Sequence, residues 1–451
     1  MATTLEILHW NDVHGRYAGL ARLSARVREI REGADHGVLV LDGGDVEESS
    51  VRLSALTYGA ASWRLLGAAA VDAAVLGNGG LLRYGPDVVP RYRDGLGTTP
   101  VLATIEHDGA VIEGAAASVL LTAGDRLVGV VGATAWFPEY PAFGLVHRDE
   151  VEAITAEATS LRERGAQVVV LLSHCGYPHD LELAGPLVGV VDLIVGGHSH
   201  TALPHGDRSA GVPITQAGQY AEHLGRVVLE VDGDGARVAS MGLEPVSPDG
   251  PQDPAVLAEL DAAERDLGEW LAEPVGTLPE ALDLSLEREC GVANLLAEAL
   301  LWKHPGDVAV LMAAHCADGL PAGVVRRGDV WAATSSPANP ATATLSGADL
   351  RSMITSGRTR EHARATRRSF RGRPYGLLHV AGAQIGADGT ITMGGEPLDD
   401  ARAYRVTGTD SELTSYSPFV EEEPGDLVLH TPMIMPELLE AYLAAHPHGV
   451  S

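Results

Sequence analysis

Seven polar side chains in this sequence are of types that bind metal ions, and each lies just after a short apolar run. They are Asp12, His14, Asp45, Asn78, His174, His198 and His200. Their oxygen and nitrogen donors, without a thiolate, suit manganese, zinc, iron or magnesium. The set exceeds the needs of one ion and suits two divalent metal ions about 3.5–4 Å apart. Asp45 is the natural bridge, because a carboxylate has two oxygens and Asp45 lies between other donors in chain order.

The spacing within two donor pairs indicates the direction in which their side chains point. Residues 191–195 form an apolar run that predicts a buried strand, and two glycines end it. His198 and His200 follow two residues apart, so in extended chain their imidazoles point to the same side. Asp12 and His14 repeat this spacing. Because open α/β sheets bind ligands beyond the carboxyl ends of their strands, we expect both pairs to face one site.

The elements that must position these donors are strands that alternate with helices. Apolar runs predict strands at residues 5–10, 38–41, 72–76, 101–103, 127–131, 167–172 and 191–195. Apolar residues at helical spacing predict helices at residues 20–30, 58–67 and 151–164. Residues 213–216 and 226–231 predict an antiparallel strand pair that closes this part of the chain. The alternation predicts an α/β layered domain.

The length of 451 residues predicts two domains. We place the first at residues 1–235 and the second at residues 275–451. Between them, residues 236–274 form a linker with one connecting helix at residues 253–271. The second domain opens with an alanine- and leucine-rich helix at residues 292–302 and then mixes short strands with Gly and Pro turns.

The composition limits the partners and the location. Asp and Glu number 61 against 32 Lys and Arg, and the net charge of -29 would repel nucleic acid and anionic membranes. No run reaches the roughly 18 apolar residues of a membrane span, and no basic leader precedes the first predicted strand. Cys175, Cys290 and Cys316 are widely spaced, which argues against a disulfide framework. We expect a cytoplasmic protein that acts on a small anionic substrate, nucleotide-like compounds included.

Five segments resemble the calcineurin-like metallophosphoesterases, and among these the two-domain 5'-nucleotidase and UDP-sugar hydrolase family. They are Asn11-Asp12-Val13-His14-Gly15-Arg16, Asp42-Gly43-Gly44-Asp45, Gly77-Asn78, Ser173-His174 and Gly196-Gly197-His198-Ser199-His200. The resemblance implies a four-layer α/β/β/α metallophosphoesterase domain and a smaller α+β C-terminal domain. Looser matches in the second domain lie at residues 291–302, 320–323, 345–347 and 377–382.

The resemblance also implies a role for each donor. One metal ion would be held by Asp12, His14, Asp45 and His200. The other would be held by Asp45, Asn78, His174 and His198. Asp45, Asn78 and His200 would also act in catalysis, in which a hydroxide bridging the two ions attacks the substrate in line.

Two positions depart from the family pattern. The family places a histidine directly after the asparagine ligand and an aspartate three residues later, and this dyad protonates the leaving oxygen. The present chain has Gly79 and Leu82 there. A positioned general acid contributes roughly 10²–10⁴-fold in rate, or about 3–5 kcal/mol. We therefore expect weaker cleavage of alkoxide leaving groups. His107, His147 and His315 are either replacement acids or plain loop and core histidines.

The substrate side of the second domain departs as well. The family's Asn-Gly-rich-Arg loop falls on residues 312–317, where Ala317 takes the arginine position, and the family's two base-stacking aromatics have no clear counterparts. The candidate substrate-binding residues are His315, Cys316, Leu377, Tyr375 and Phe419. The arginine-rich segment at residues 358–373 is either a solvated loop or a surface that recruits anions.

Three functions fit these observations. The first is a two-metal hydrolase of a phosphorylated or other anionic small molecule. The second is a metal-binding pseudoenzyme or small-molecule binder whose catalysis lapsed with the dyad. The third is a sulfur-ester hydrolase, because the thiosulfohydrolase branch of the resembled fold also lacks the histidine and cleaves a sulfur bond.

Overall fold

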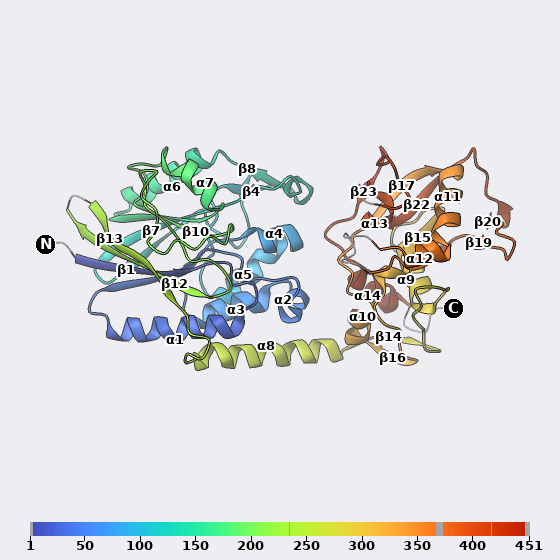
Figure 1. Cartoon of the computed structure of the whole chain (residues 1–451), viewed down its shortest axis with the longest axis horizontal. Helices are drawn as coiled ribbons and strands as arrows, with labels where there is room; N and C mark the ends of the chain where they lie inside the picture. The colour runs from blue at the N-terminus through green and yellow to red at the C-terminus, as the bar shows by residue number, and fades with distance from the viewer. Residues whose placement is uncertain (1–2, 234, 367–372, 416, 447–451) are drawn as a thin grey trace. The chain divides into compact units, whose positions relative to one another are not determined.

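The computed structural model describes residues 3–233, 235–366, 373–415 and 417–446 and divides into two compact units (Figure 1). The first unit is Met1–Leu267 and the second is Gly268–Ser451. The division falls within helix α8 (Pro254–Ala272), the connecting helix that the sequence predicts. No helix in the described ranges combines the length and hydropathy needed to cross a membrane.

Two five-stranded sheets form the centre of the first unit. In spatial order, the first sheet contains β13 (Gly235–Pro245), β12 (His223–Asp232), β1 (Thr3–Trp10), β2 (Gly37–Asp42) and β3 (Ala73–Ala74). The second contains β11 (Ile214–Gln216), β10 (Leu193–Gly196), β9 (Val168–His174), β7 (Arg126–Thr134) and β6 (Ser118–Ala123). A small third sheet contains β5 (Ala110–Val111), β4 (Ile105–His107) and β8 (Leu145–His147).

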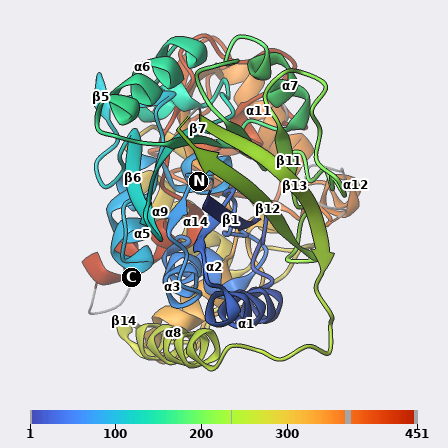
Figure 2. The ribbon, with the colours of Figure 1, turned by 90° about the vertical axis from the view of Figure 1, so that its left-hand side faces the viewer.

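The two large sheets pack face to face, and helices cover their outer faces. Fully buried side chains from both sheets, such as Ile7 of β1 and Val170 of β9, share one apolar core. A second core joins the other face of β9 to α6 (Glu150–Glu163) and α7 (Tyr177–Ala184). Helices α1 (Tyr17–Gly33) and α3 (Ala60–Ala68) lie on the opposite side of the unit (Figure 2). This arrangement confirms the four-layer α/β/β/α architecture.

The remaining helical elements of the first unit are short. They are α2 (Arg52–Leu56), α4 (Asn78–Tyr84), α5 (Val89–Leu96) and the 3-10 turns Pro86–Val88 and Tyr140–Phe143. Helix α4 begins at a predicted donor, and β1 and β2 run parallel with Trp10 opposite Asp42. Strands β7, β9 and β10 are also parallel. The carboxyl ends of both sheets therefore present the loops that carry the donors.

Two expectations about the end of the first domain need correction. The predicted pairing of residues 213–216 with 226–231 is wrong, since β11 pairs with β10 in one sheet and β12 pairs with β1 in the other. Residues 236–245, which the sequence places in the linker, instead belong to β13 and pair antiparallel with β12. Their small and polar residues show little apolar alternation, so β12 rather than local pattern stabilises this strand.

The second unit is an α+β structure. Its main sheet contains, in spatial order, β18 (Leu378–Ala381), β15 (Val308–Met312), β22 (Ala403–Thr409), β17 (Pro340–Ser346) and β23 (Val428–Leu429). Smaller sheets pair β14 (Pro274–Leu278) with β16 (Gly323–Arg326), and β19 (Gln384–Ile385) and β21 (Glu396–Pro397) with β20 (Ile391–Met393). Its helical elements are α9 (Gly291–Lys303), α10 (Arg327–Ala333), α11 (Gly347–Gly357), α12 (Arg360–Arg364), α13 (Asp410–Leu413), α14 (Met435–Ala445) and the 3-10 turn Ala313–His315. Helices α9 and α14 pack through buried side chains against β15.

Candidate metal centre

The seven predicted donors lie at or after strand ends of both sheets in the first unit. They follow or end β1 (Asp12 and His14), β2 (Asp45), β3 (Asn78), β9 (His174) and β10 (His198 and His200). The structure gathers two groups whose possible ligand atoms lie within 4.8 Å of one another: Asp12, His14 and His200, and Asp12, Asp45 and His174. Asp12 is common to both groups. The bridging role that the sequence gives Asp45 stays a prediction.

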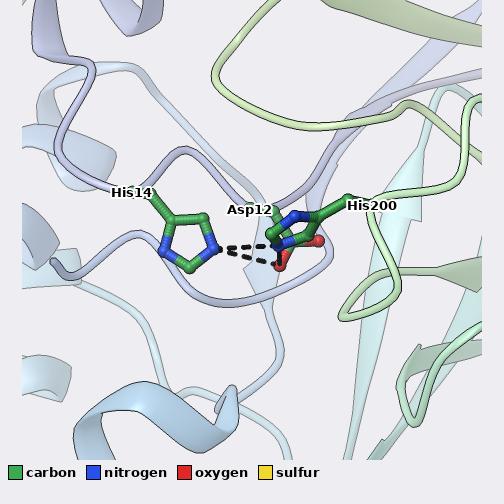
Figure 3. Close-up of side chains that lie close together, drawn as sticks. All are labelled: Asp12, His14 and His200. Atoms are coloured by element: carbon green, nitrogen blue, oxygen red, sulfur yellow. Dashed lines mark hydrogen bonds and ion pairs between the residues drawn. The ribbon is translucent and has the colours of Figure 1, made fainter. Parts of the chain in front are cut away.

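The first group converges on one carboxylate oxygen (Figure 3). Asp12 Oδ1 lies 3.4 Å from His14 Nε2 and 3.2 Å from His200 Nε2. The two imidazole nitrogens lie only 3.1 Å apart. Asp12 is fully buried, yet its Oδ1 accepts no hydrogen bond from the described residues. A buried carboxylate oxygen without a hydrogen bond is costly, so this geometry fits a cation held among the three side chains.

Backbone carbonyls orient two of the imidazoles. His14 Nδ1 lies 3.2 Å from the carbonyl of Glu47, and His174 Nδ1 lies 2.6 Å from the carbonyl of Gly43. A carbonyl only accepts, so each Nδ1 carries the hydrogen and, in the neutral ring, each Nε2 presents a lone pair. Nε2 of His174 is buried and has no hydrogen-bond partner within the described ranges. Metal-binding histidines are typically held in this way.

The electrostatics of the second group favour a positive charge. His174 Nε2 lies 3.3 Å from Asp45 Oδ2. Burial favours the neutral imidazole, but the charge of Asp45 outweighs it and raises the pKa of His174 to about 10. Burial likewise opposes the ionised carboxyl, yet His174 lowers the pKa of Asp45. A divalent cation would supply the positive charge that stabilises the ionised carboxyls here, and the neutral imidazoles would bind it through their lone pairs.

The other two donors border these groups. The backbone N–H of His198 donates to Asp12 Oδ2 over 2.8 Å, and its ring lies edge-on to that of His174 at 5.2 Å. Asn78 begins α4 and directly precedes Gly79, whose N–H donates to Asp45 Oδ1, and Asn78 Oδ1 is buried without a hydrogen-bond partner among the described residues. The structure thus places all seven donors in one region of the first unit.

The backbone of the donor loops is strained. Five donors adopt positive φ angles: Asp12 (52°), His14 (45°), Asp45 (54°), His198 (72°) and His200 (56°). Side chains other than glycine avoid this region, and each such residue costs about 1–3 kcal/mol. Strain of this kind persists where surrounding structure enforces it, commonly at functional sites. The donors are therefore held by the fold at a local energetic cost.

The positions of the missing dyad lie beside this cluster. The N–H of Gly79 donates to Asp45 Oδ1 over 2.8 Å, and a Cβ at residue 79 would lie 3.2 Å from the same oxygen. Leu82 is partly buried on α4. Among the candidate replacement acids, His147 stacks on Trp136 with a centroid distance of 5.0 Å, and His107 lies beside Asp108. Their replacement role stays a prediction.

Sequence reasoning did not single out three residues that border the donors. Glu47 is buried, its carboxylate accepts from Trp63 Nε1, and burial raises its pKa to about 7. The Tyr220 ring lies 5.9 Å from that of His14, and the Phe137 ring lies 6.0 Å from that of His198. All three follow strand ends, so the rule that found the donors would have found them if applied to every residue type.

In the second unit, the candidate substrate residues His315 and Cys316 lie in the interior. Both are almost fully buried. His315 Nε2 lies 3.2 Å from Glu412 Oε1, and its Nδ1 lies 2.8 Å from Ser336 Oγ. The His315 side chain therefore forms part of an internal hydrogen-bond network, and the substrate role of both residues stays a prediction.

The candidate aromatic residues gather around one imidazole. His362 stacks on Tyr375 at 5.1 Å and lies 4.8 Å from the ring of Phe419. Leu377 is buried on the neighbouring segment. The chain's own histidine thus contacts both aromatic rings.

Part of the arginine-rich segment at residues 358–373 is internally paired. Arg358 pairs with Glu289, and Arg364 pairs with Glu287. Arg367, Arg368 and Arg371 lie outside the described residues. The described pairs are typical of a surface held by ion pairs.

Comparison with known proteins finds similar sequences for both units of the chain. Residues 274–414 match the family described as "5'-nucleotidase, C-terminal domain". A 5'-nucleotidase of Bos taurus is 28% identical over 356 residues, covering 68% of this chain and 61% of that protein. The chain thus spans less than two thirds of that relative's length.

Solved structures share the fold over nearly the whole chain. A 5'-nucleotidase precursor from Thermus thermophilus superposes with a TM-score of 0.54 at 21% identity, covering 98% of this chain and 97% of that one. A sulfate thiohydrolase from Thermus thermophilus gives 0.51 at 20% identity, covering 98% and 94%. Together these matches confirm the resemblance: the chain is a homologue of the two-domain 5'-nucleotidases, with a 5'-nucleotidase C-terminal domain in its second unit.

Proposed function

We propose that the first unit binds two divalent metal ions and hydrolyses a phosphate ester or a related anionic small molecule. The observation that carries this proposal is a set of three buried ligand atoms, all without a hydrogen bond from the described residues and all in the donor region. They are Asp12 Oδ1, Asn78 Oδ1 and His174 Nε2. Leaving buried polar atoms unpaired is costly, and metal coordination would remove that cost.

The residues present fit such a centre. Asp12, His14, Asp45 and His200 would hold one ion, and Asp45, Asn78, His174 and His198 would hold the other. Bound divalent ions would stabilise negative charge on the reacting phosphoryl group and lower the pKa of water. The carbonyls of Gly43 and Glu47 would keep His174 and His14 correctly oriented.

The residues at the dyad positions limit the leaving groups. Gly79 and Leu82 have no group that donates a proton from a side chain. Alkoxide leaving groups need a proton in the transition state, whereas pyrophosphate, aryl oxides and sulfides leave without one. We therefore propose anhydrides and aryl esters as better substrates than alkyl phosphates. The same observation favours sulfur-ester hydrolysis as a second candidate, because sulfide is a good leaving group.

The test is elemental analysis of the purified full-length protein, followed by a turnover screen of the metal-loaded form. The screen should include p-nitrophenyl phosphate, an alkyl phosphate, a nucleoside diphosphate and a sulfur ester. We expect two equivalents of divalent metal and faster turnover of aryl and anhydride substrates than of alkyl phosphates. Tight metal binding without turnover of any compound would instead identify a pseudoenzyme. Protein that binds no metal would overturn the proposal.

A further inference from the structure

Arg16 and Tyr220 form a pair at the edge of the metal centre. The Arg16 guanidinium carbon lies 4.8 Å from the centroid of the Tyr220 ring. The same ring lies 5.9 Å from that of His14 and 6.1 Å from that of His200. A planar guanidinium that stacks on an aromatic ring keeps its N–H edge available for hydrogen bonds. The positively charged guanidinium of Arg16 therefore lies on a ring that borders the first donor group.

The exposure of these side chains increases away from Asp12. The Asp12 side chain is 0% exposed, while His14 and His200 are 16% and 35% exposed. Tyr220 is 37% exposed, and Arg16 is also exposed. The donors thus lie at the buried end and the guanidinium at the solvent end. A substrate held by the donors would extend toward Arg16.

Arg16 also differs from many arginines of the first unit. Arg26, Arg28, Arg31, Arg64, Arg162 and Arg226 each pair with a carboxylate. Within the part of the chain that the structure describes, no carboxylate lies at ion-pair distance from Arg16. Other arginines of the first unit, such as Arg52, Arg83 and Arg91, likewise have no described carboxylate at that distance, so what distinguishes Arg16 is its place beside the donors.

The backbone holds Tyr220 in place at a cost. Tyr220 and Ala221 adopt positive φ angles of 58° and 59°. The N–H of Tyr220 donates to the carbonyl of Asp12 over 2.8 Å, which ties this loop to the donor loop. Two successive strained residues other than glycine indicate that the ring position is imposed by the fold. The fold therefore fixes the position of the ring on which Arg16 stacks.

We propose that Arg16, supported by Tyr220, binds a second anionic group of the substrate, next to the phosphoryl group held by the donors. This inference rests on the function proposed above and names its substrate class: small molecules with two neighbouring anionic groups. Arginine binds phosphate and carboxylate oxygens through two parallel hydrogen bonds. The second group is accordingly a phosphate, as in a phosphoanhydride, or a carboxylate, as in a phosphorylated acid.

Steady-state kinetics of the metal-loaded full chain test this proposal. Pyrophosphate and 2-phosphoglycolate carry a second phosphate or carboxylate, and p-nitrophenyl phosphate carries neither. In Arg16→Gln we expect KM to rise about 10- to 100-fold for the substrates with a second anion, while p-nitrophenyl phosphate changes less than about threefold. Whether pyrophosphate or 2-phosphoglycolate loses more identifies the second group.

Three variants control for indirect effects. Tyr220→Leu removes the ring and should reproduce the KM increase, whereas Tyr220→Phe keeps the ring and should not. Arg91 lies 6.0 Å from the Tyr58 ring in a similar arrangement, so Arg91→Gln is the matched control and should behave like the wild type. Metal content, measured on each variant, should stay constant. Equal losses for all three substrates in Arg16→Gln, or no loss, would overturn the proposal.

Calorimetry separates this inference from the function on which it rests. Binding of 2-phosphoglycolate and of inorganic phosphate to the metal-loaded protein requires no turnover. If the wild type hydrolyses none of the substrates, but Arg16→Gln loses only the preference for 2-phosphoglycolate, hydrolysis fails as a proposal and anion selection by Arg16 stands. If the wild type binds neither 2-phosphoglycolate nor methylenediphosphonate, a non-hydrolysable pyrophosphate analogue, more tightly than inorganic phosphate, the Arg16 proposal fails whatever the turnover.

Discussion

Each unit contains a buried histidine beside a buried carboxylate, and the two pairs differ in whether the Nε2 atom that faces the carboxylate makes a hydrogen bond. His174 lies 3.3 Å from Asp45, and His315 lies 3.2 Å from Glu412. In the first pair, His174 Nε2 has no hydrogen-bond partner among the described residues. In the second, both ring nitrogens of His315 have partners. Single unsatisfied buried atoms also occur elsewhere, as at His304 Nε2 in the second unit, so the donor region is distinguished by the three such ligand atoms that it contains.

Asp45 of the first pair accepts from the N–H of Gly79 over 2.8 Å, so among the carboxylates the contrast lies between Glu412 and Asp12. Glu412 accepts from the N–H of Met312 over 2.8 Å and from the N–H of Thr409 over 3.0 Å. Asp12 in the first unit leaves Oδ1 without a hydrogen bond from the described residues. Asp12 also has positive φ, whereas none of the described residues near Glu412 does. We therefore expect substitutions in the first unit to affect metal binding and activity, and substitutions in the second to affect stability.

The largest effect should follow Asp12→Asn. This change removes the charge shared by both donor groups while keeping the side chain's shape. Loss of a residue that merely supports a ligand costs about 10- to 100-fold in metal affinity, so loss of Asp12 should cost more than about 100-fold. Metal content and turnover, measured together, should both collapse. Full metal content in Asp12→Asn would show that the donor groups sharing Asp12 do not hold the metal.

Glu412→Gln should have the converse effect. The substitution leaves the buried His315 without its ionic partner, which should lower the free energy of unfolding by about 3 kcal/mol. Burial acts to raise the pKa of Glu412, but His315 and the surrounding hydrogen bonds outweigh it and lower that pKa. Urea denaturation should show the loss, while elemental analysis shows unchanged metal content. A loss of bound metal would contradict the internal role of the pair.

A third prediction concerns pH and the second unit. His379 is fully buried, and burial lowers its pKa from 6.5 to about 4. The folded state thus favours the neutral ring. The contribution of His379 to the free energy of unfolding is therefore complete above about pH 6.5 and is lost as the pH falls toward 4. The loss should reach about 3 kcal/mol. Denaturation between pH 7 and 4 should show a smaller decline in His379→Gln, and an unchanged decline would refute the assignment.

The smallest effect should follow Gly79→His. The new Cβ would lie 3.2 Å from Asp45 Oδ1, so Asp45 must shift by a few tenths of an ångström. A proton donor here should raise the turnover of alkyl phosphates by up to about tenfold, below the full range for a general acid, because Leu82 still lacks a carboxylate. Aryl phosphates should not benefit. Activity that arises from none in Gly79→His with Leu82→Asp would favour the pseudoenzyme alternative.

Most of the donor region could be predicted from the polar residues at the ends of predicted strands. Asp12, Asp45 and His174 each lie at or after an apolar run that becomes a strand, because an apolar run must be buried and its polar successor then lies at a sheet edge. In the second unit, the family pattern rather than this reasoning singles out His315, and its substrate role stays a prediction. His315 also follows a buried strand, β15, but there the edge is covered and its partners are internal.

The sequence by itself determined the α/β class, the family resemblance and which side chains have metal-binding chemistry, because periodicity and residue type are local properties. Only the tertiary structure decided that two sheets share the donors and that β11 and β12 belong to different sheets. It also decided that Arg16 stacks on Tyr220 at the edge of the donor group. Those outcomes depend on which buried faces pack together and which polar atoms are left unpaired. Such long-range choices are made by the whole chain and leave little trace in any single segment.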